Sequence, residues 1–247
     1  MQLTLEQWLA QPDVLLVVDT IQPPSGPMPK GQSATLKPKE LGLFLAITGA
    51  GKVYAFNGHV DLGTGIRTSL AQIVAEELYL QLDQVEMVLG DTERAPNQGA
   101  TIASATIQIS AVPLRNAAAE ARRHLLQLAS ERWQTPGEQL TLEDGVFSHP
   151  DGRQLAFGEL ITGQHVRLQI SGEAPLKPAS EYRLVGQGAA RVDIPAKATG
   201  ELTYVHDMRL PGMLHGRVIR PPYAGYDSGD FVGNSLLSVD ELSLIHI

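Results

Sequence analysis

Residues 103–134 form a long, alanine-rich stretch in which apolar side chains recur at helical spacing. The recurring positions are Leu114, Ala118, Ala121, Leu125 and Leu128. Small alanine side chains favour close packing on a sheet or on a second helix. Pro113 interrupts the stretch, and a proline inside a helix removes a backbone hydrogen bond. We therefore predict either one kinked helix or two helices, with Pro113 in the first turn of the second.

Strand-like runs surround a second predicted helix. Leu70, Ile73, Val74 and Leu78 follow helical spacing and predict a helix over residues 67–81. Gly49-Ala50-Gly51 lies between two apolar runs and predicts a hairpin. The predicted strands are Val14–Val18, Leu41–Thr48, Lys52–Asn57, Val85–Leu89, Leu140–Glu143, Gly145–Ser148 and Val166–Ile170, with short helices at Leu5–Leu9 and 157–162. This alternation predicts an α+β fold, a mixed α/β chain.

The composition excludes several classes of protein. The 247 residues carry 19 Lys and Arg against 27 Asp and Glu, so an acidic surface argues against nucleic acid or an anionic membrane as partner. The chain contains no cysteine, which excludes disulfides, a cysteine nucleophile and cysteine-ligated metal clusters in it. No apolar run approaches the roughly 18 residues of a membrane helix, and no signal peptide is visible. We expect a cytoplasmic protein with no membrane span.

Proline-containing stretches and several polar residues receive plain structural interpretations. Residues 22–39 and 172–182 are predicted to be linkers. Gly49-Ala50-Gly51-Lys52 lacks the other residues of a phosphate loop and is interpreted as a turn. The seven histidines show no metal-ligand spacing, so no metal site is predicted; His59 lies near a glycine loop, but a packing or surface role is favoured. Glu76 and Glu77 are interpreted as solvated charges on a polar helix face.

Two loops that open helices are the strongest indication of a ligand. The first covers residues 63–68 (GTGIRT) and the second covers residues 98–108 (QGATIASATIQ). Both place small residues and hydroxyl groups before a helix, where exposed N–H groups and the helix dipole favour an anion. Two such loops suit a long phosphate-bearing ligand. The alternative is that both are ordinary helix caps that bind nothing.

The stretch GHVDLGTGIRTSLAQIVAEELYLQLDQVEMVLGDTERAPNQGATIASATIQISAVPLRNAAAEAR resembles the molybdopterin-binding subunit of the xanthine dehydrogenase/aldehyde oxidase family. So does RVDIPAKATGELTYVHDMRLPGMLHGRVIRPP, and the similarity is greatest to the nicotinate dehydrogenase and isoquinoline 1-oxidoreductase branch. The resemblance implies a bound molybdopterin cytosine dinucleotide with molybdenum. It also implies hydroxylation of an aromatic N-heterocycle or an aldehyde with oxygen from water. Electrons would pass to 2Fe–2S clusters on a small iron–sulfur partner subunit.

The resemblance also assigns site residues. The family's Gly-Gln-Gly loop falls on Gly63, Thr64 and Gly65, so a short hydroxyl stands here in place of a long amide. The loop that grips the pterin and phosphates falls on the second loop, and Gln108, one turn into the helix, is expected to face inward. The implied cofactor-binding residues are Gly63, Thr64, Gly65, Thr68, Thr101, Ala103, Ser104, Thr106 and Gln108. No catalytic residue is assigned, because nothing here matches the late segment that carries the family's catalytic glutamate.

The resemblance divides the chain into two portions. Residues 1–175 are expected to be part of the molybdopterin-binding domain, and residues 180–247 the start of an α/β hammerhead-like domain that is cut short. We therefore expect an N-terminal fragment of the subunit, inactive by itself. Two alternatives remain open: a non-catalytic cofactor-binding or assembly module, and a structural subunit in which both loops are plain caps.

Overall fold

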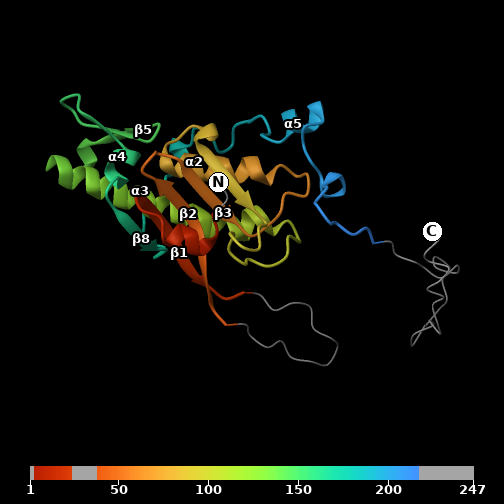
Figure 1. Cartoon of the computed structure of the whole chain (residues 1–247). Helices are drawn as coiled ribbons and strands as arrows, with labels where there is room; N and C mark the ends of the chain where they lie inside the picture. Colours follow the sequence, from red (N-terminus) through yellow and green to blue (C-terminus); the bar gives the residue numbers. More distant parts are fainter. Residues whose placement is uncertain (1–2, 24–37, 217–247) are drawn as a thin grey trace, which may run out of the picture. The chain divides into compact units, whose positions relative to one another are not determined.

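The computed structural model describes residues 3–23 and 38–216 (Figure 1). The chain divides into two compact units, Met1–Leu202 and Thr203–Ile247. Helices and strands mix within the first unit, which confirms the predicted α+β class. Most of the linker predicted over residues 22–39 lies outside the described residues. No helix in the described parts of the chain is long and apolar enough to cross a membrane.

A five-stranded sheet forms the centre of the first unit, in the order β4-β3-β2-β1-β8. Its strands are β1 (Val14–Ile21), β2 (Glu40–Thr48), β3 (Val53–Asn57), β4 (Val85–Leu89) and β8 (His165–Gln169). β2 is antiparallel to both β1 and β3, so the predicted hairpin is confirmed, while β4 and β8 run parallel to their neighbours. The apolar run at the start of β1 reflects burial on both faces of the sheet.

Two long helices cover one face of this sheet. α2 (Ile66–Leu78) and α3 (Ala111–Trp133) pack against it and against each other, and Figure 1 shows α3, in green, behind the strands. The fully buried alanines of α3 are Ala117, Ala118, Ala119, Ala121 and Ala129. They confirm the close packing that the sequence predicts. Trp8 of the short α1 (Leu5–Leu9) packs on the opposite face.

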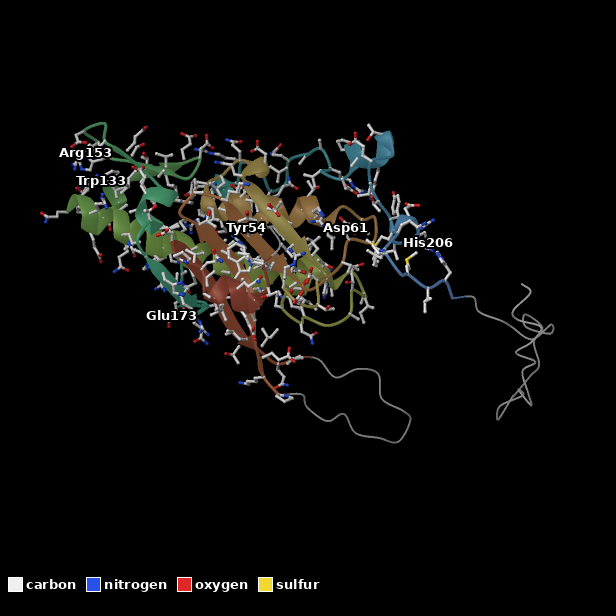
Figure 2. The ribbon with its side chains drawn as sticks, viewed as in Figure 1. Tyr54, Asp61, Trp133, Arg153, Glu173 and His206 are labelled. Atoms are coloured by element: carbon white, nitrogen blue, oxygen red, sulfur yellow. The ribbon has the colours of Figure 1, made fainter. Side chains whose placement is uncertain are left out.

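A second, three-stranded antiparallel sheet consists of β5 (Thr141–Glu143), β6 (Val146–Ser148) and β7 (Gln154–Ala156). β5 and β6 were predicted, but β7 was not, although the three strands are equally short. α4 (Phe157–Ile161) follows it directly. Figure 2 shows Arg153 beside Trp133, where the guanidinium lies 5.6 Å from the centre of the indole ring. This contact ties the small sheet to the end of α3.

The start of α3 resolves the two alternatives for Pro113. A π-helical turn, η2 (Thr106–Ser110), comes first, and α3 begins at Ala111. Pro113 therefore lies in the first turn of α3, where a missing N–H has no partner within the helix. The chain forms two successive helical segments here rather than one uniform helix. The remaining short elements are η1 (Leu82–Gln84), η3 (Gly137–Gln139), η4 (Ala179–Glu181), α5 (Ile194–Thr199) and η5 (Val205–Asp207).

Two predictions around α2 are wrong. Glu76 and Glu77 are not solvated: their exposed fractions are 3% and 1%. Residues 172–182 do not form a free linker, because they belong to a longer segment, residues 171–193, that packs along α2. We call this segment the strap. The first compact unit continues past it to Leu202, and the division of the chain near residues 175–180 stays a prediction.

Candidate functional site

The two predicted loops meet at one groove of about 330 Å³. Thr64 reaches it from the first loop, and Thr101, Ala103, Ser104 and Thr106 reach it from the second. The other lining residues are Leu62, Ile66, Ile102 and Ile107. The described lining therefore offers hydroxyl groups and apolar surface, and it contains no charged side chain. Five of the nine residues assigned from the sequence lie together here.

Asp61, labelled in Figure 2, is half-buried and lies at the N-terminal end of α2. Its Oδ1 accepts hydrogen bonds from the N–H groups of Gly63 (2.9 Å) and Gly65 (3.1 Å). Its Oδ2 accepts from the N–H of Arg67 at 3.1 Å. The chain's own carboxylate therefore takes three of the N–H groups of this loop, and whether the loop binds an anionic ligand stays a prediction.

Asp61 is held in its charged form. Burial by itself would raise the pKa of this carboxyl, but the hydrogen bonds from the N–H groups of Arg67, Gly65 and Gly63 outweigh burial. The pKa of Asp61 consequently lies below its usual value. A negative charge at this position also complements the positive end of the α2 dipole. Thr64 and Ile66 are the residues of the first loop that line the groove.

Replacing Asp61 with asparagine is expected to lower the unfolding free energy by about 1–2 kcal/mol. The amide keeps one acceptor oxygen but turns an NH2 group toward the N–H of Arg67. Urea denaturation at neutral pH measures the change. Asp83→Asn, at an exposed position in η1, is the matched control and should change little. Equal effects of the two substitutions would contradict this account of the loop.

A buried polar network fixes the second loop to the end of β3. His59 is 3% exposed, and its Nδ1 lies 2.8 Å from Oγ1 of Thr106 and 3.4 Å from Oγ of Ser110. Asn57 donates to the carbonyl of Ser110 at 3.0 Å and accepts from the N–H of His59. His59 therefore has the packing role that the sequence favoured. Through Thr106 it also sets one wall of the groove.

Gln98 and Thr101 join the second loop to the residues that follow β3. Oε1 of Gln98 accepts from the N–H of Gly58, and its Nε2 donates to the carbonyl of Ser110, both at 2.9 Å. Oγ1 of Thr101 accepts from the N–H of Val60 at 2.9 Å. These contacts span about 40 positions of sequence. Such side-chain bonds to backbone groups have no local sequence signal, so the role of Gln98 was missed.

Ala103 and Ser104 adopt left-handed backbone conformations, with φ angles of 52° and 55°. For residues other than glycine this costs roughly 1–2 kcal/mol each, and such strain is concentrated at functional sites. Both residues are exposed at the groove. Among the residues that the structure describes, none accepts a hydrogen bond from either N–H group or from the Ser104 hydroxyl. The second loop therefore presents unused donors to a ligand.

The other assigned residues lie away from the groove lining. Thr68 is buried, and its Oγ1 accepts from the N–H of Val192 in the strap. Gly63 and Gly65 contact Asp61, and Gln108 is exposed on η2 rather than turned inward. Whether these four bind a cofactor stays a prediction. In the described part of the chain no group of three or more His, Asp or Glu side chains could hold a metal ion.

The fold thus combines a mixed sheet under two helices with two small-residue loops that meet at an uncharged groove. The family described as "Molybdopterin cofactor-binding domain" matches residues 24–204, and the chain belongs to it. The resemblance to the xanthine dehydrogenase/aldehyde oxidase family is thereby confirmed.

Two curated relatives belong to the predicted branch. The chain is 69% identical over 242 residues to a subunit of nicotinate dehydrogenase from Pseudomonas putida, covering 98% of this chain and 20% of the relative. It is 32% identical over 207 residues to the beta subunit of isoquinoline 1-oxidoreductase from Brevundimonas diminuta, covering 67% and 26%. Quinoline 2-oxidoreductase from Pseudomonas putida 86, a solved structure, is 27% identical over 47% of this chain and 15% of that chain, with a TM-score of 0.40. The chain thus spans about a quarter or less of these proteins.

Proposed function

We propose that this chain is the cofactor-binding part of a molybdenum hydroxylase subunit, and that the groove holds the molybdopterin. The observation that carries the proposal is the set of unused donors on Ala103 and Ser104 at an uncharged groove. Phosphate oxygens accept such hydrogen bonds, and no carboxylate lines the groove to repel them. The apolar lining suits the faces of a pterin ring.

The chain's own residues would bind and orient the cofactor. Thr64, Ser104 and Thr106 supply hydroxyl groups, and the N–H groups of Ala103 and Ser104 supply backbone donors. When bound, the molybdenum centre supplies the oxidising chemistry. No carboxylate is found among the described residues that line the groove, so we assign no general base there.

The finer assignments belong to the same proposal. The cofactor is the cytosine dinucleotide form, and the substrate is an aromatic N-heterocycle or an aldehyde that is hydroxylated with oxygen from water. The names of two relatives, nicotinate dehydrogenase and isoquinoline 1-oxidoreductase, support a heterocyclic substrate. A separate iron–sulfur subunit with 2Fe–2S clusters would accept the electrons. The absence of cysteine from this chain agrees with that division.

Substitution of Ser104 tests the proposal. Ser104→Asp is expected to remove most of the molybdenum and cytosine nucleotide from the purified protein, because a carboxylate would repel phosphate at this groove. Ser104→Gly keeps the N–H donor and relieves the left-handed strain, so it should retain cofactor and gain about 1 kcal/mol of stability. Metal and nucleotide content are measured per polypeptide, in the full polypeptide that the gene encodes.

The outcomes separate the proposed function from the alternatives in which the loops bind no cofactor. Wild-type protein without molybdenum or nucleotide would refute the proposed function. Undiminished cofactor in Ser104→Asp, with wild-type protein loaded, would show that the second loop only starts a helix. Circular dichroism checks that each substituted protein keeps its fold, and cofactor contents are compared only between folded proteins.

A further inference from the structure

Buried glutamates fix the first half of the strap to α2 and α3. Oε1 of Glu76 accepts a hydrogen bond from Nζ of Lys177 at 2.6 Å, and Glu77 accepts from the Lys177 N–H at 3.0 Å. Glu120 accepts from the N–H of Ser171 at 3.1 Å and from its hydroxyl. The three glutamates are each at most 3% exposed. Since buried charges are costly to leave unpaired, these contacts hold the strap firmly in place.

The middle of the strap is fixed through its backbone. Oε2 of Glu76 accepts from three successive N–H groups, those of Arg183 (2.9 Å), Leu184 (2.6 Å) and Val185 (2.8 Å). Gln72, one turn earlier on α2, donates to the carbonyl of Leu184 at 2.9 Å. The strap therefore runs along α2 toward the N-terminal end of that helix, where the first loop lies.

The far end of the strap contacts the first loop directly. The N–H of Val192 donates to Oγ1 of Thr68 at 3.1 Å, and Nη1 of Arg191 donates to the carbonyl of Gly63 at 2.9 Å. Asp193 holds the same guanidinium through Nε (3.0 Å) and Nη2 (2.7 Å). A bidentate pair of this kind fixes the plane of the guanidinium and so directs Nη1 toward the loop.

Arg191 also explains why the loop needs a glycine at position 65. Gly65 has a φ angle of +81°, and a Cβ there would lie 3.2 Å from Cδ and Nε of Arg191. The loop is thus held on two sides: Asp61 takes its N–H groups, and Arg191 takes a carbonyl and covers Gly65. Thr64 lies between these two attachments and faces the groove.

We propose that Arg191 is a positioning residue that fixes the first loop and thereby the direction in which Thr64 faces the groove. It acts on the cofactor only through the loop, so this part of the inference rests on the proposed function. The attachment of Arg191 to the loop does not depend on the proposed function. Residues 191 and 63 are 128 positions apart, and the strap supplies the connection between them.

Hydrogen exchange tests the attachment in cofactor-free protein. Arg191→Ala is expected to raise the exchange rate of residues 62–67 by about tenfold, the scale of one lost charge-assisted hydrogen bond. The N–H groups of residues 183–185 and the thermal midpoint should hardly change. Arg191→Lys should restore the protection in part, because an ammonium cannot bind Asp193 bidentately and still reach Gly63. Arg183→Ala is the matched control, because Arg183 also lies on the strap but its side chain pairs with the exposed Glu143 of β5.

A second measurement addresses the cofactor. In the full polypeptide, Arg191→Ala is expected to lose molybdenum and nucleotide several-fold faster than wild type or Arg183→Ala during dialysis. Unchanged exchange at residues 62–67 overturns the inference. Raised exchange with a wild-type protein that binds no molybdenum leaves the attachment standing and refutes the proposed function instead. If exchange is raised in Arg191→Ala but this variant loses cofactor no faster than wild type, then Arg191 does not position the loop for the cofactor.

Discussion

Replacing Glu76 with glutamine is expected to lower the unfolding free energy by about 3–5 kcal/mol, because it breaks a buried ion pair from one side. The carboxylate accepts from Lys177 and from three N–H groups of the strap. An amide would turn an NH2 group toward some of these donors and leave the Lys177 ammonium, 3% exposed, without a carboxylate on Glu76 to pair with. Urea denaturation gives the free energy. Glu143→Gln, in an exposed pair with Arg183, should cost less than about 1 kcal/mol.

The same substitution should change how stability depends on pH. Burial would raise the pKa of Glu76, but Lys177 and the strap N–H groups lower it to about 2, from an ordinary value of 4.5. A carboxyl with a depressed pKa contributes stability that is fully present above the unfolded value and is lost as pH falls toward the folded one. Wild-type stability should therefore fall more steeply between about pH 4.5 and 2 than that of Glu76→Gln. Parallel curves would contradict the assignment.

Replacing Gly58 with alanine is expected to destabilise the protein by about 3 kcal/mol, at the upper end of overpacking effects. A Cβ at this position would lie 2.1 Å from the carbonyl oxygen of Pro96 and 2.9 Å from the backbone nitrogen of Gln98. Both are backbone atoms, so the whole second loop would have to move. Its movement would break the hydrogen bond from the Gly58 N–H to Gln98 and so loosen the groove.

Gly188→Ala provides the control for this steric argument. No atom lies within 4 Å of a Cβ at position 188, and its φ angle is not in the left-handed range. The unfolding free energies of the two variants, measured by thermal and urea unfolding, should therefore differ by more than about 2 kcal/mol. If Gly58→Ala stays within 0.5 kcal/mol of Gly188→Ala, roughly the noise of such comparisons, then the second loop is not packed as described.

Elements with strong periodicity were predicted well because their signal is local. The strand Val85–Leu89 has the bounds that the sequence gives it, and α2 differs mainly at its end. The predicted helix over 67–81 ends at Leu78 because Tyr79 adopts a left-handed conformation, with φ 53°. Helix-forming side chains continue past this point, so composition alone could not locate the turn.

The strap was missed for a different reason. Its prolines and polar residues are typical of a linker, whereas its position depends on glutamates about 100 residues earlier. Glu76 and Glu77 in turn look like solvated charges, since the groups that pair with them lie on other elements. A single sequence does not show which backbone N–H groups will meet which carboxylate.

The candidate site was predictable in its location and not in its detail. Small residues before a helix are a local signal, and five of the nine residues assigned from the sequence line one groove, although their binding of a cofactor stays a prediction. Asp61 could have been noticed as well, because aspartate commonly bonds the backbone N–H two residues further on, here that of Gly63. The left-handed backbone conformation of Ala103 and Ser104 could not be predicted from the sequence, because neither residue type favours it.

The strap also sets where this domain can be divided. A piece that stops at residue 175 would keep Glu76 and Glu77 but lose every strap group that neutralises or bonds them, along with Arg191. Glu76 would then lose its partner Lys177, while Glu77 would keep its ion pairs with Arg115 and Arg122, and the first loop would lose the contact from Arg191. We therefore expect the shortest N-terminal portion that keeps the geometry of both loops to reach at least to Asp193.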